Sequence, residues 1–147
     1  MRFMLLQYYA EPDSGAPPMT EWTPEEVRAH IDFQNVLNAE LIERGEFVDA
    51  QGLSARDQAQ VVTVDASGAR VVTDGPFPES KELLAGYRTI DVDSRERALE
   101  IAARAAAAPA QGGQPIRDRI EVREVLSAPG PEVDSDAALV DWLREHI

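Results

Sequence analysis

The chain has 147 residues, of which 44% are hydrophobic, and this is enough apolar surface for the core of one domain. Its 27 acidic and 14 basic side chains give a formal net charge of −13, which repels phosphate backbones and anionic lipids, so we expect neither nucleic acid nor membrane as a partner. The absence of cysteine excludes disulfides and thiolate chemistry. No signal peptide is seen, and no apolar run approaches the ~20 residues of a membrane helix, so we expect a cytoplasmic protein.

The first half of the chain predicts a strand followed by a long helix. The run "RFMLLQYYA" (2–10) is short, apolar and aromatic, which is typical of a buried strand. Residues 23–45 begin with Thr23 as a helix cap and Pro24 at the first helical position, and Gly45 ends the pattern. The side chains expected to face a core are Val27, Ile31, Val36, Leu37 and Leu41.

The rest of the chain alternates strands with one more core helix. Ser94 is the expected cap of an Ala-rich helix that ends before Pro109. Strands are predicted at 46–53, 58–65, 69–75, 84–93 and 119–125, the third being the return arm of a hairpin, and a short amphipathic helix is predicted at 137–147.

This order of elements predicts an α+β fold. Without the inserted hairpin arm it is the ferredoxin-like βαββαβ plan, in which two helices cover one face of an antiparallel sheet. We expect one domain over 1–126 and a linker with a helical extension over 127–147. Since strand 84–93 carries apolar or aromatic side chains on both faces, a second copy should cover the other face, which predicts a homodimer with a cavity between the sheets.

The stretch "DGPFPESKELLAGY" (74–87) lies between two predicted strands and closely resembles the DGPF signature of the YCII-related proteins. The resemblance also includes "MRFMLLQYY", "GEFVDAQGL", "TIDVDSRERALEIAA" and "IEVREV", so it extends over about 1–126. The positions that match the signature are Asp74, Gly75, Pro76, Phe77, Glu79, Lys81, Glu82 and Gly86.

The resemblance implies a dimeric α+β barrel and, for most members, no established activity. Some relatives resemble cofactor-independent enzymes that act on small aromatic or ring compounds through a histidine and an acid. Others are found beside alternative sigma factors, which suggests a regulatory role.

Asp74 is the first candidate catalytic residue. Asp-Gly-Pro is a strong turn signal in its own right, because Asp can bond the following amides and Pro fixes φ. A turn alone does not require the aromatic and charged residues that follow it. A carboxylate at a strand end, near the mouth of a barrel, could be a general base if burial raises its pKa.

His30 is the second candidate catalytic residue. It lies four residues after Glu26 in the first helix, so one interpretation is a solvated histidine paired with that acid. The other rests on the family resemblance, because the stretch "AHIDFQNVLNAELIERGEF" resembles that around the helical histidine of smaller YCII proteins, which is thought to pair with an acid in the cavity. This chain has "AAAAPA" where those proteins have an Asp-Pro pair, so we expect Asp74 to be the partner.

Other side chains are candidates for binding a small-molecule ligand. Lys81 and Glu82 could equally form a surface ion pair, and the aromatic residues could equally be core. Arg88 or Arg123, if directed into the cavity, would favour an anionic or phenolate-like ligand. The candidate substrate-binding residues are Tyr8, Phe77, Lys81, Glu82, Tyr87 and Arg88, with Tyr9 as a further cavity-lining aromatic.

The motifs that define metal, cofactor and serine-nucleophile sites are absent from the sequence. Two distant histidines and scattered acids give no metal-ligand spacing, and no Gly-x-Ser-x-Gly elbow or phosphate-binding glycine loop occurs. We therefore expect neither a metal nor a cofactor.

Three hypotheses remain for the function. The first is a cofactor-independent acid-base enzyme that performs elimination, isomerisation or hydrolysis on a small cyclic or aromatic substrate. The second is a non-catalytic ligand-binding or regulatory protein associated with a sigma-factor system. In the third, the dimer itself matters, and the tail helix docks onto the other subunit or another protein through Leu139, Val140, Trp142, Leu143 and Ile147.

Overall fold

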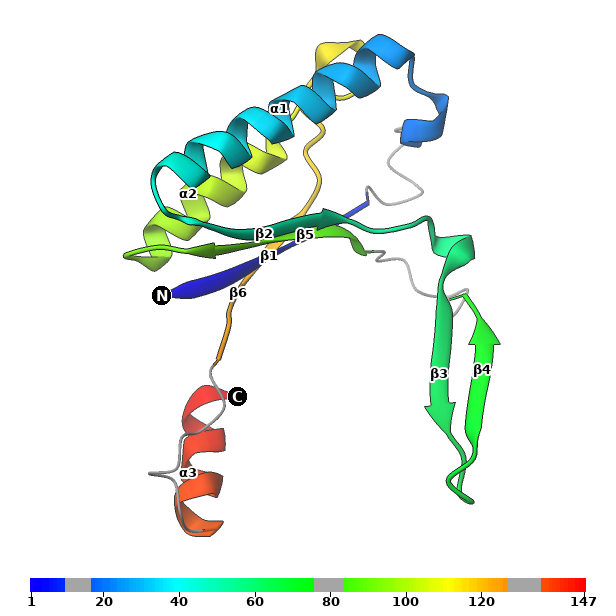
Figure 1. Ribbon diagram of the computed structural model, residues 1–147, viewed down its shortest axis with the longest axis vertical. Helices are drawn as coiled ribbons and strands as arrows, with labels where there is room; N and C mark the ends of the chain where they lie inside the picture. The colour runs from blue at the N-terminus through cyan, green and yellow to red at the C-terminus, as the bar shows by residue number, and fades with distance from the viewer. Residues whose placement is uncertain (10–16, 76–83, 127–135) are drawn as a thin grey trace.

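The computed structural model describes residues 1–9, 17–75, 84–126 and 136–147 (Figure 1). Each predicted strand and helix is present, with ends that differ from the expected ones by at most two residues. The elements are β1 (Arg2–Tyr8), α1 (Pro24–Glu43), β2 (Phe47–Gly52), β3 (Gln60–Val64), β4 (Arg70–Asp74), β5 (Leu84–Asp91), α2 (Arg95–Ala106), β6 (Ile120–Glu124) and α3 (Asp136–His146), with 3-10 turns at Met19–Glu21, Arg56–Gln58 and Gln111–Gly113.

The main sheet has four antiparallel strands in the order β2-β5-β1-β6, and β3 and β4 form a separate hairpin. An α+β class is therefore confirmed, and the strand order is compatible with the ferredoxin-like plan. In the centre of the sheet, Leu5 of β1 lies between Arg88 of β5 and Val122 of β6. These three side chains share one face, because directly opposed residues of antiparallel strands point the same way.

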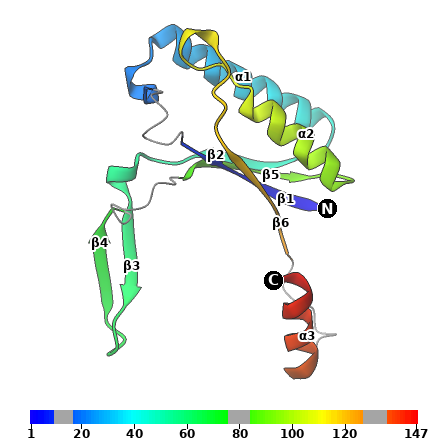
Figure 2. The same ribbon diagram turned by 180° about the vertical axis from the view of Figure 1, so that it is seen from behind.

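Helices α1 and α2 cover that face of the sheet, as the opposite views in Figures 1 and 2 show. An ion pair between Arg104 of α2 and Glu40 of α1 joins the two helices, with 2.6 Å between Nη2 and Oε2. The alanines of α2 let this helix approach the sheet closely. The buried core consists of Phe3, Leu5, Leu37, Leu41, Ile90, Val92, Ala98, Ile101, Ala102 and Ala105.

The buried side of α1 differs from the predicted one. Leu37 and Leu41 are buried, but Ile31 and Val36 are 49% and 59% exposed, so placing these two in the core was wrong. His30 is buried instead. Positions 30, 37 and 41 are separated by seven and four residues, which puts them on one side of a helix with 3.6 residues per turn.

The start of α1 is fixed by its sequence. Thr23 accepts a hydrogen bond from the backbone N–H of Glu26, and the Glu26 carboxylate accepts one from the N–H of Thr23, which completes a capping box with Pro24 at the first position. The helix ends where Gly45 adopts a φ of 71°. The predicted boundaries of this helix are confirmed.

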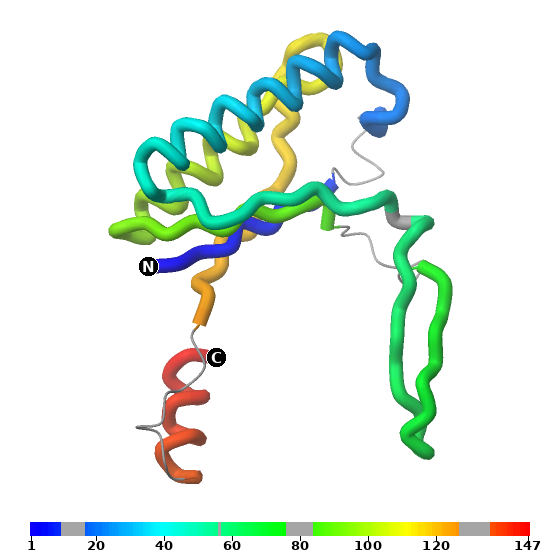
Figure 3. Tube along the Cα trace, viewed as in Figure 1, coloured from blue at the N-terminus to red at the C-terminus, as the bar shows by residue number. Residues whose placement is uncertain are grey.

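The β3–β4 hairpin and α3 lie away from the layer of helices, on the open side of the sheet (Figure 3). Every residue of β4 is exposed, and α3 has no buried residue. In α3, His146 stacks on Trp142 with 4.6 Å between the ring centroids. No helix among the described residues has the length and apolar character needed to cross a membrane.

Candidate active site

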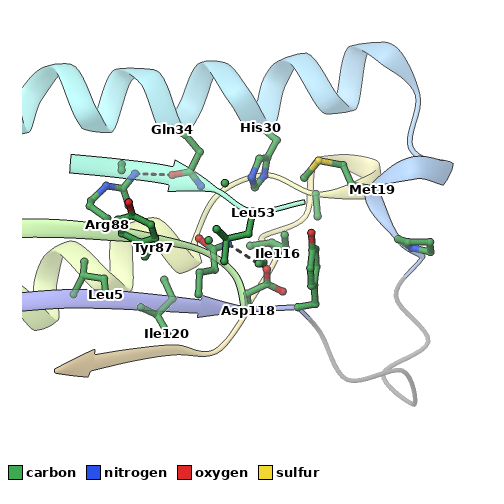
Figure 4. Close-up of a pocket in the computed structure, with 18 of the residues that line it drawn as sticks. Leu5, Met19, His30, Gln34, Leu53, Tyr87, Arg88, Ile116, Asp118 and Ile120 are labelled. Carbon is green, nitrogen blue, oxygen red and sulfur yellow. Dashed lines mark hydrogen bonds between the residues drawn. The ribbon is translucent and has the colours of Figure 1, made fainter. Parts of the chain in front are cut away.

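A pocket of about 800 Å³ lies between α1, the strands β1 and β5, and the segment 108–118 that leads into β6 (Figure 4). It lies within one chain, on the side of the sheet that the helices cover, and the cavity between the sheets of two copies stays a prediction. Its lining is mostly apolar, with a few polar side chains directed inward, which is the usual composition of a small-molecule site. The polar members that matter most are His30, Asp118 and Arg88.

His30 projects from α1 into this pocket (Figure 4) and is only 7% exposed, so the solvated interpretation is wrong. Its Nδ1 lies 3.0 Å from the carbonyl oxygen of Pro109. A carbonyl oxygen can only accept, so Nδ1 carries the hydrogen and Nε2 of the neutral ring has the free lone pair. Trp22 packs edge-on against the imidazole at 5.7 Å between centroids. The ring is therefore fixed with one basic nitrogen available.

The segment 108–118 holds the Pro109 carbonyl in place. Pro109 and Pro115 form an isolated antiparallel bridge, and the N–H of Ile116 donates to the carbonyl of Ala108 at 2.7 Å. The N–H of Gly112, whose φ is 66°, donates to Oε1 of Glu26 at 2.7 Å. The same glutamate that caps α1 thus fastens this segment to the helix that carries the histidine.

Asp118 lies just before β6 and is 6% exposed. Its Oδ2 accepts a hydrogen bond from Nε2 of Gln7 at 3.2 Å, but its Oδ1 is the one buried side-chain oxygen or nitrogen without a partner in the described ranges. Burial raises the pKa of Asp118 above its usual range, while the bond from Gln7 and the charge of His30 partly oppose this. An acid and a base therefore share one pocket and influence each other electrostatically.

Arg88 occupies a buried position in β5, directly below α1. It is 6% exposed, and its Nε and Nη2 donate to Oδ1 of Asn38 and Oε1 of Gln34, both at 2.9 Å. Burial lowers the pKa of Arg88 to about 10, so the guanidinium stays charged at neutral pH. Both partners are neutral amides, and Arg88 makes no ion pair with any residue that the structure describes.

Of the three predicted tyrosines, two line the pocket and one does not. Tyr87 lies at its edge, because it alternates with Arg88 on β5 and pairs with Leu6, which directs its side chain toward the open face. Tyr87 and Tyr9 line the pocket, and the Tyr87 hydroxyl donates to Oδ2 of Asp49 at 2.8 Å. Tyr8 does not line it, because its hydroxyl donates to Oε2 of Glu121 at 3.1 Å on the open face. Strand alternation explains the difference between the neighbours Tyr8 and Tyr9.

Asp74, the expected partner of His30, lies elsewhere. It is the last residue of β4, where it pairs with Gln60 and is exposed, and it is not among the described residues that line the pocket. The turn itself is present, because Gly75 has a φ of 70° and its N–H donates to the carbonyl of Ala59 at 2.7 Å. The structure therefore brings His30 together with Asp118 and Arg88, and not with Asp74.

Three more predicted residues, Phe77, Lys81 and Glu82, lie outside the described residues. The sequence analysis missed Asp118, Gln34 and Asn38, although patterns for them exist. Gln34 and Asn38 follow His30 at intervals of four on α1. Asp118 lies two residues before Ile120 and four before Val122, so strand alternation directs all three side chains to the same, inward face.

No group of three or more His, Asp or Glu side chains in the described parts of the chain is arranged to hold a metal ion. The described residues of the candidate site thus include the imidazole of His30, the buried carboxyl of Asp118 and the buried guanidinium of Arg88. Side chains of these three types are capable of acid-base chemistry and of binding a small molecule.

The sequence comparisons identify the family. Residues 1–127 match the YCII-related domain, and because this is most of the chain, the protein belongs to the YCII-related family. None of the curated proteins searched matches the chain. Family membership is therefore established, and the activity has to be inferred from the pocket.

Proposed function

We propose that this YCII-related protein is a cofactor-independent acid-base enzyme that moves a proton on a small cyclic or aromatic substrate. The observation that supports this most is the state of His30. Its Nδ1–H is held by the Pro109 carbonyl, and this leaves Nε2 as the base in the pocket. Fixing the tautomer in advance removes the need to reorient the ring during the reaction.

In this mechanism, His30 Nε2 takes a proton from a carbon next to a carbonyl group of the substrate. The C–H bond breaks, an N–H bond forms, and the electron pair moves into the carbonyl to give an enolate. The imidazolium keeps its bond to Pro109, and the Asp118 carboxylate in the same pocket stabilises its positive charge. Return of the proton to another carbon gives isomerisation, and loss of a leaving group gives elimination.

Exchange with heavy water tests this function without knowledge of the product. The protein is incubated in D₂O with a panel of cyclic ketones and unsaturated lactones, each with and without a ring carboxylate, and loss of the C–H signal is followed by ¹H NMR. We expect exchange above the buffer rate with at least one member. His30→Gln should slow it by about 10²- to 10⁴-fold, which is the usual contribution of a general base.

His146→Gln is the matched control, since this second histidine lies in α3 and does not line the pocket. It should leave the exchange rate unchanged. If panel members bind in the pocket but none exchanges above buffer, the enzyme proposal is wrong, and a non-catalytic ligand-binding role takes its place. Equal rates in the wild-type protein and His30→Gln would also refute it.

We also propose that the protein is a homodimer in which a second copy covers the open face of the sheet. This face presents Met4, Leu6 and Tyr8, which are all only partly buried in the single chain. A contiguous apolar strip on a sheet face is typical of an interface. Sedimentation should give twice the chain mass for the wild-type protein and a monomer for Leu6→Arg; a monomeric wild type would contradict the proposal.

A further inference from the structure

Among the residues that the structure describes, none forms an ion pair with Arg88. The charged group of an arginine residue that is only 6% exposed normally has a carboxylate partner, because the cost of removing a charge from water is otherwise uncompensated. Here its two hydrogen bonds go to the side-chain amides of Gln34 and Asn38. These amides orient the guanidinium without neutralising it.

One nitrogen of this group is free to bind a ligand. Nε and Nη2 donate to α1, while Nη1 has no acceptor among the residues that the structure describes. If Nη1 were fully buried, it would be a buried polar atom without a partner. Within the described residues only Asp118 Oδ1 is such an atom, so Nη1 is not fully buried. Since Arg88 lines the pocket, we infer that this nitrogen is accessible from it.

The pocket also fixes how far the cation lies from the base. In Figure 4, Gln34 lies between Arg88 and His30 along α1. Gln34 follows His30 by four residues, which is about 6 Å along the helix axis at 1.5 Å per residue. The Arg88 guanidinium bonds both Gln34 and Asn38, which follow His30 by four and eight residues, so it lies about 6 to 12 Å from the histidine along the helix axis. This interval has room for a six-membered ring that carries a carboxylate, and Leu5, Leu53 and Ile116 supply apolar walls beside it.

We propose that the pocket binds a cyclic monocarboxylate, with the carboxylate on Arg88 and the ring directed toward His30. A planar guanidinium matches a planar carboxylate, with Nη1 and the second hydrogen of Nη2 as donors. Asp118, which also lines the pocket, disfavours a second negative charge on the ligand. This inference rests on the proposed function and specifies its substrate class.

The test compares benzoate with benzamide, a neutral molecule of almost the same shape. Each is titrated into ¹⁵N-labelled protein at neutral pH, and the side-chain amide signals of Gln34 and Asn38 are followed. We expect benzoate to bind at least 10-fold more tightly than benzamide. Hydrogen bonds to a charged group that is kept from water are typically worth a factor of about 10 to 100 in affinity.

Two variants remove the charge in different ways. Arg88→Met deletes the cation, whereas Gln34→Glu keeps the shape of the site and supplies a carboxylate that neutralises Arg88 from within. Both should abolish the preference for benzoate over benzamide. Arg123→Met is the matched control, because this arginine on β6 has a 69% exposed side chain, and it should keep the full preference.

The proposal is wrong if the wild-type protein shows no preference for benzoate, including the case in which neither ligand shifts the pocket signals. It is also wrong if folded Gln34→Glu keeps the preference, which covers the possibility that Arg88→Met does not fold. His30→Gln separates this proposal from the proposed function, because it should lose proton exchange yet retain the benzoate preference. Exchange on neutral substrates without a benzoate preference would refute only the carboxylate proposal.

Discussion

Replacing Asp118 by asparagine should stabilise the protein while impairing its proposed reaction. The carboxylate is 6% exposed, and its Oδ1 has no hydrogen-bond partner in the described ranges. A buried polar group without a partner costs about 1–3 kcal/mol, and more when it is charged. Asparagine can still accept the bond from Gln7 through its carbonyl oxygen. Its Nδ2 then takes the place of Oδ1, also without a partner, so the gain comes from not burying a negative charge.

We therefore expect Asp118→Asn to raise the free energy of unfolding at pH 7 by about 1 kcal/mol or more. For a chain of this size, this corresponds to a rise in Tm of about 2–4 °C per kcal/mol. Thermal unfolding followed by circular dichroism measures the change. The proton-exchange rate should fall at the same time, because the imidazolium of His30 loses its negative partner, and such a trade of stability for activity is common at functional sites.

The pH dependence gives this prediction a sign. Burial raises the pKa of Asp118 in the folded protein above its ordinary value of 3.8, so the folded state holds this proton more tightly than the unfolded state. The stabilisation that comes from this protonated carboxyl is fully present below pH 3.8, and it is lost as the pH rises through the pKa of Asp118 in the folded protein. The advantage of Asp118→Asn should thus be largest near neutral pH and disappear as the pH falls toward that limit.

Asp65, at the turn of the β3–β4 hairpin, is the matched control with the opposite sign. Its Oδ1 accepts hydrogen bonds from the hydroxyl of Ser67 and from the N–H groups of Ser67 and Ala69, and these lower the pKa of Asp65. Asp65→Asn should therefore lose stability at neutral pH and approach wild type in acid. A lower Tm for Asp118→Asn at pH 7, or a gain that does not change with pH, would refute the reasoning.

Two further predictions concern packing. In Gly86→Ala, the new Cβ would lie 2.7 Å from the carbonyl oxygen of Gln51 across the β2–β5 pair at the edge of the pocket. Urea unfolding should therefore show a free energy of unfolding lower by about 1–3 kcal/mol. Gly52→Ala, whose new Cβ has nothing within 4 Å, should lose less than half as much. Leu37→Ala empties a fully buried position and should cost about 2–5 kcal/mol, whereas Val36→Ala, at a position 59% exposed, should stay within about 0.5 kcal/mol of wild type in the same assay. Equal losses within either pair would show that the packing described here is wrong.

Much of the fold could be read from local patterns. Thr23, Pro24 and Gly45 predicted the ends of α1, and Ser94 predicted the start of α2, because capping and positive φ depend on residues within one turn of the helix end. Strand β1 followed from its apolar and aromatic run, and β6 from its alternation. The family followed from motifs spread along the chain, and its match over residues 1–127 agrees with them.

The sequence was less informative about which residues meet. A histidine at position 30 fitted a solvated helix surface as well as a buried one, and Ile31 and Val36 looked equally suited to the core. The buried side of α1 is the one that carries His30, because the sheet and the segment 108–118 pack against it. Periodicity defines the sides of a helix, but not which side the rest of the chain will cover.

The sequence by itself determined the family, the α+β class and the limits of the main helices, because each depends on short-range chemistry or on motifs visible in the chain. Only the tertiary structure decided that the acid in the pocket of His30 is Asp118 rather than Asp74, and that Arg88 lies buried beside Leu5 on the neighbouring strand with no carboxylate partner in the described ranges. These residues are 88 and 58 positions from His30 in the sequence. Contacts over such separations are set by how whole elements stack, and no local pattern encodes them.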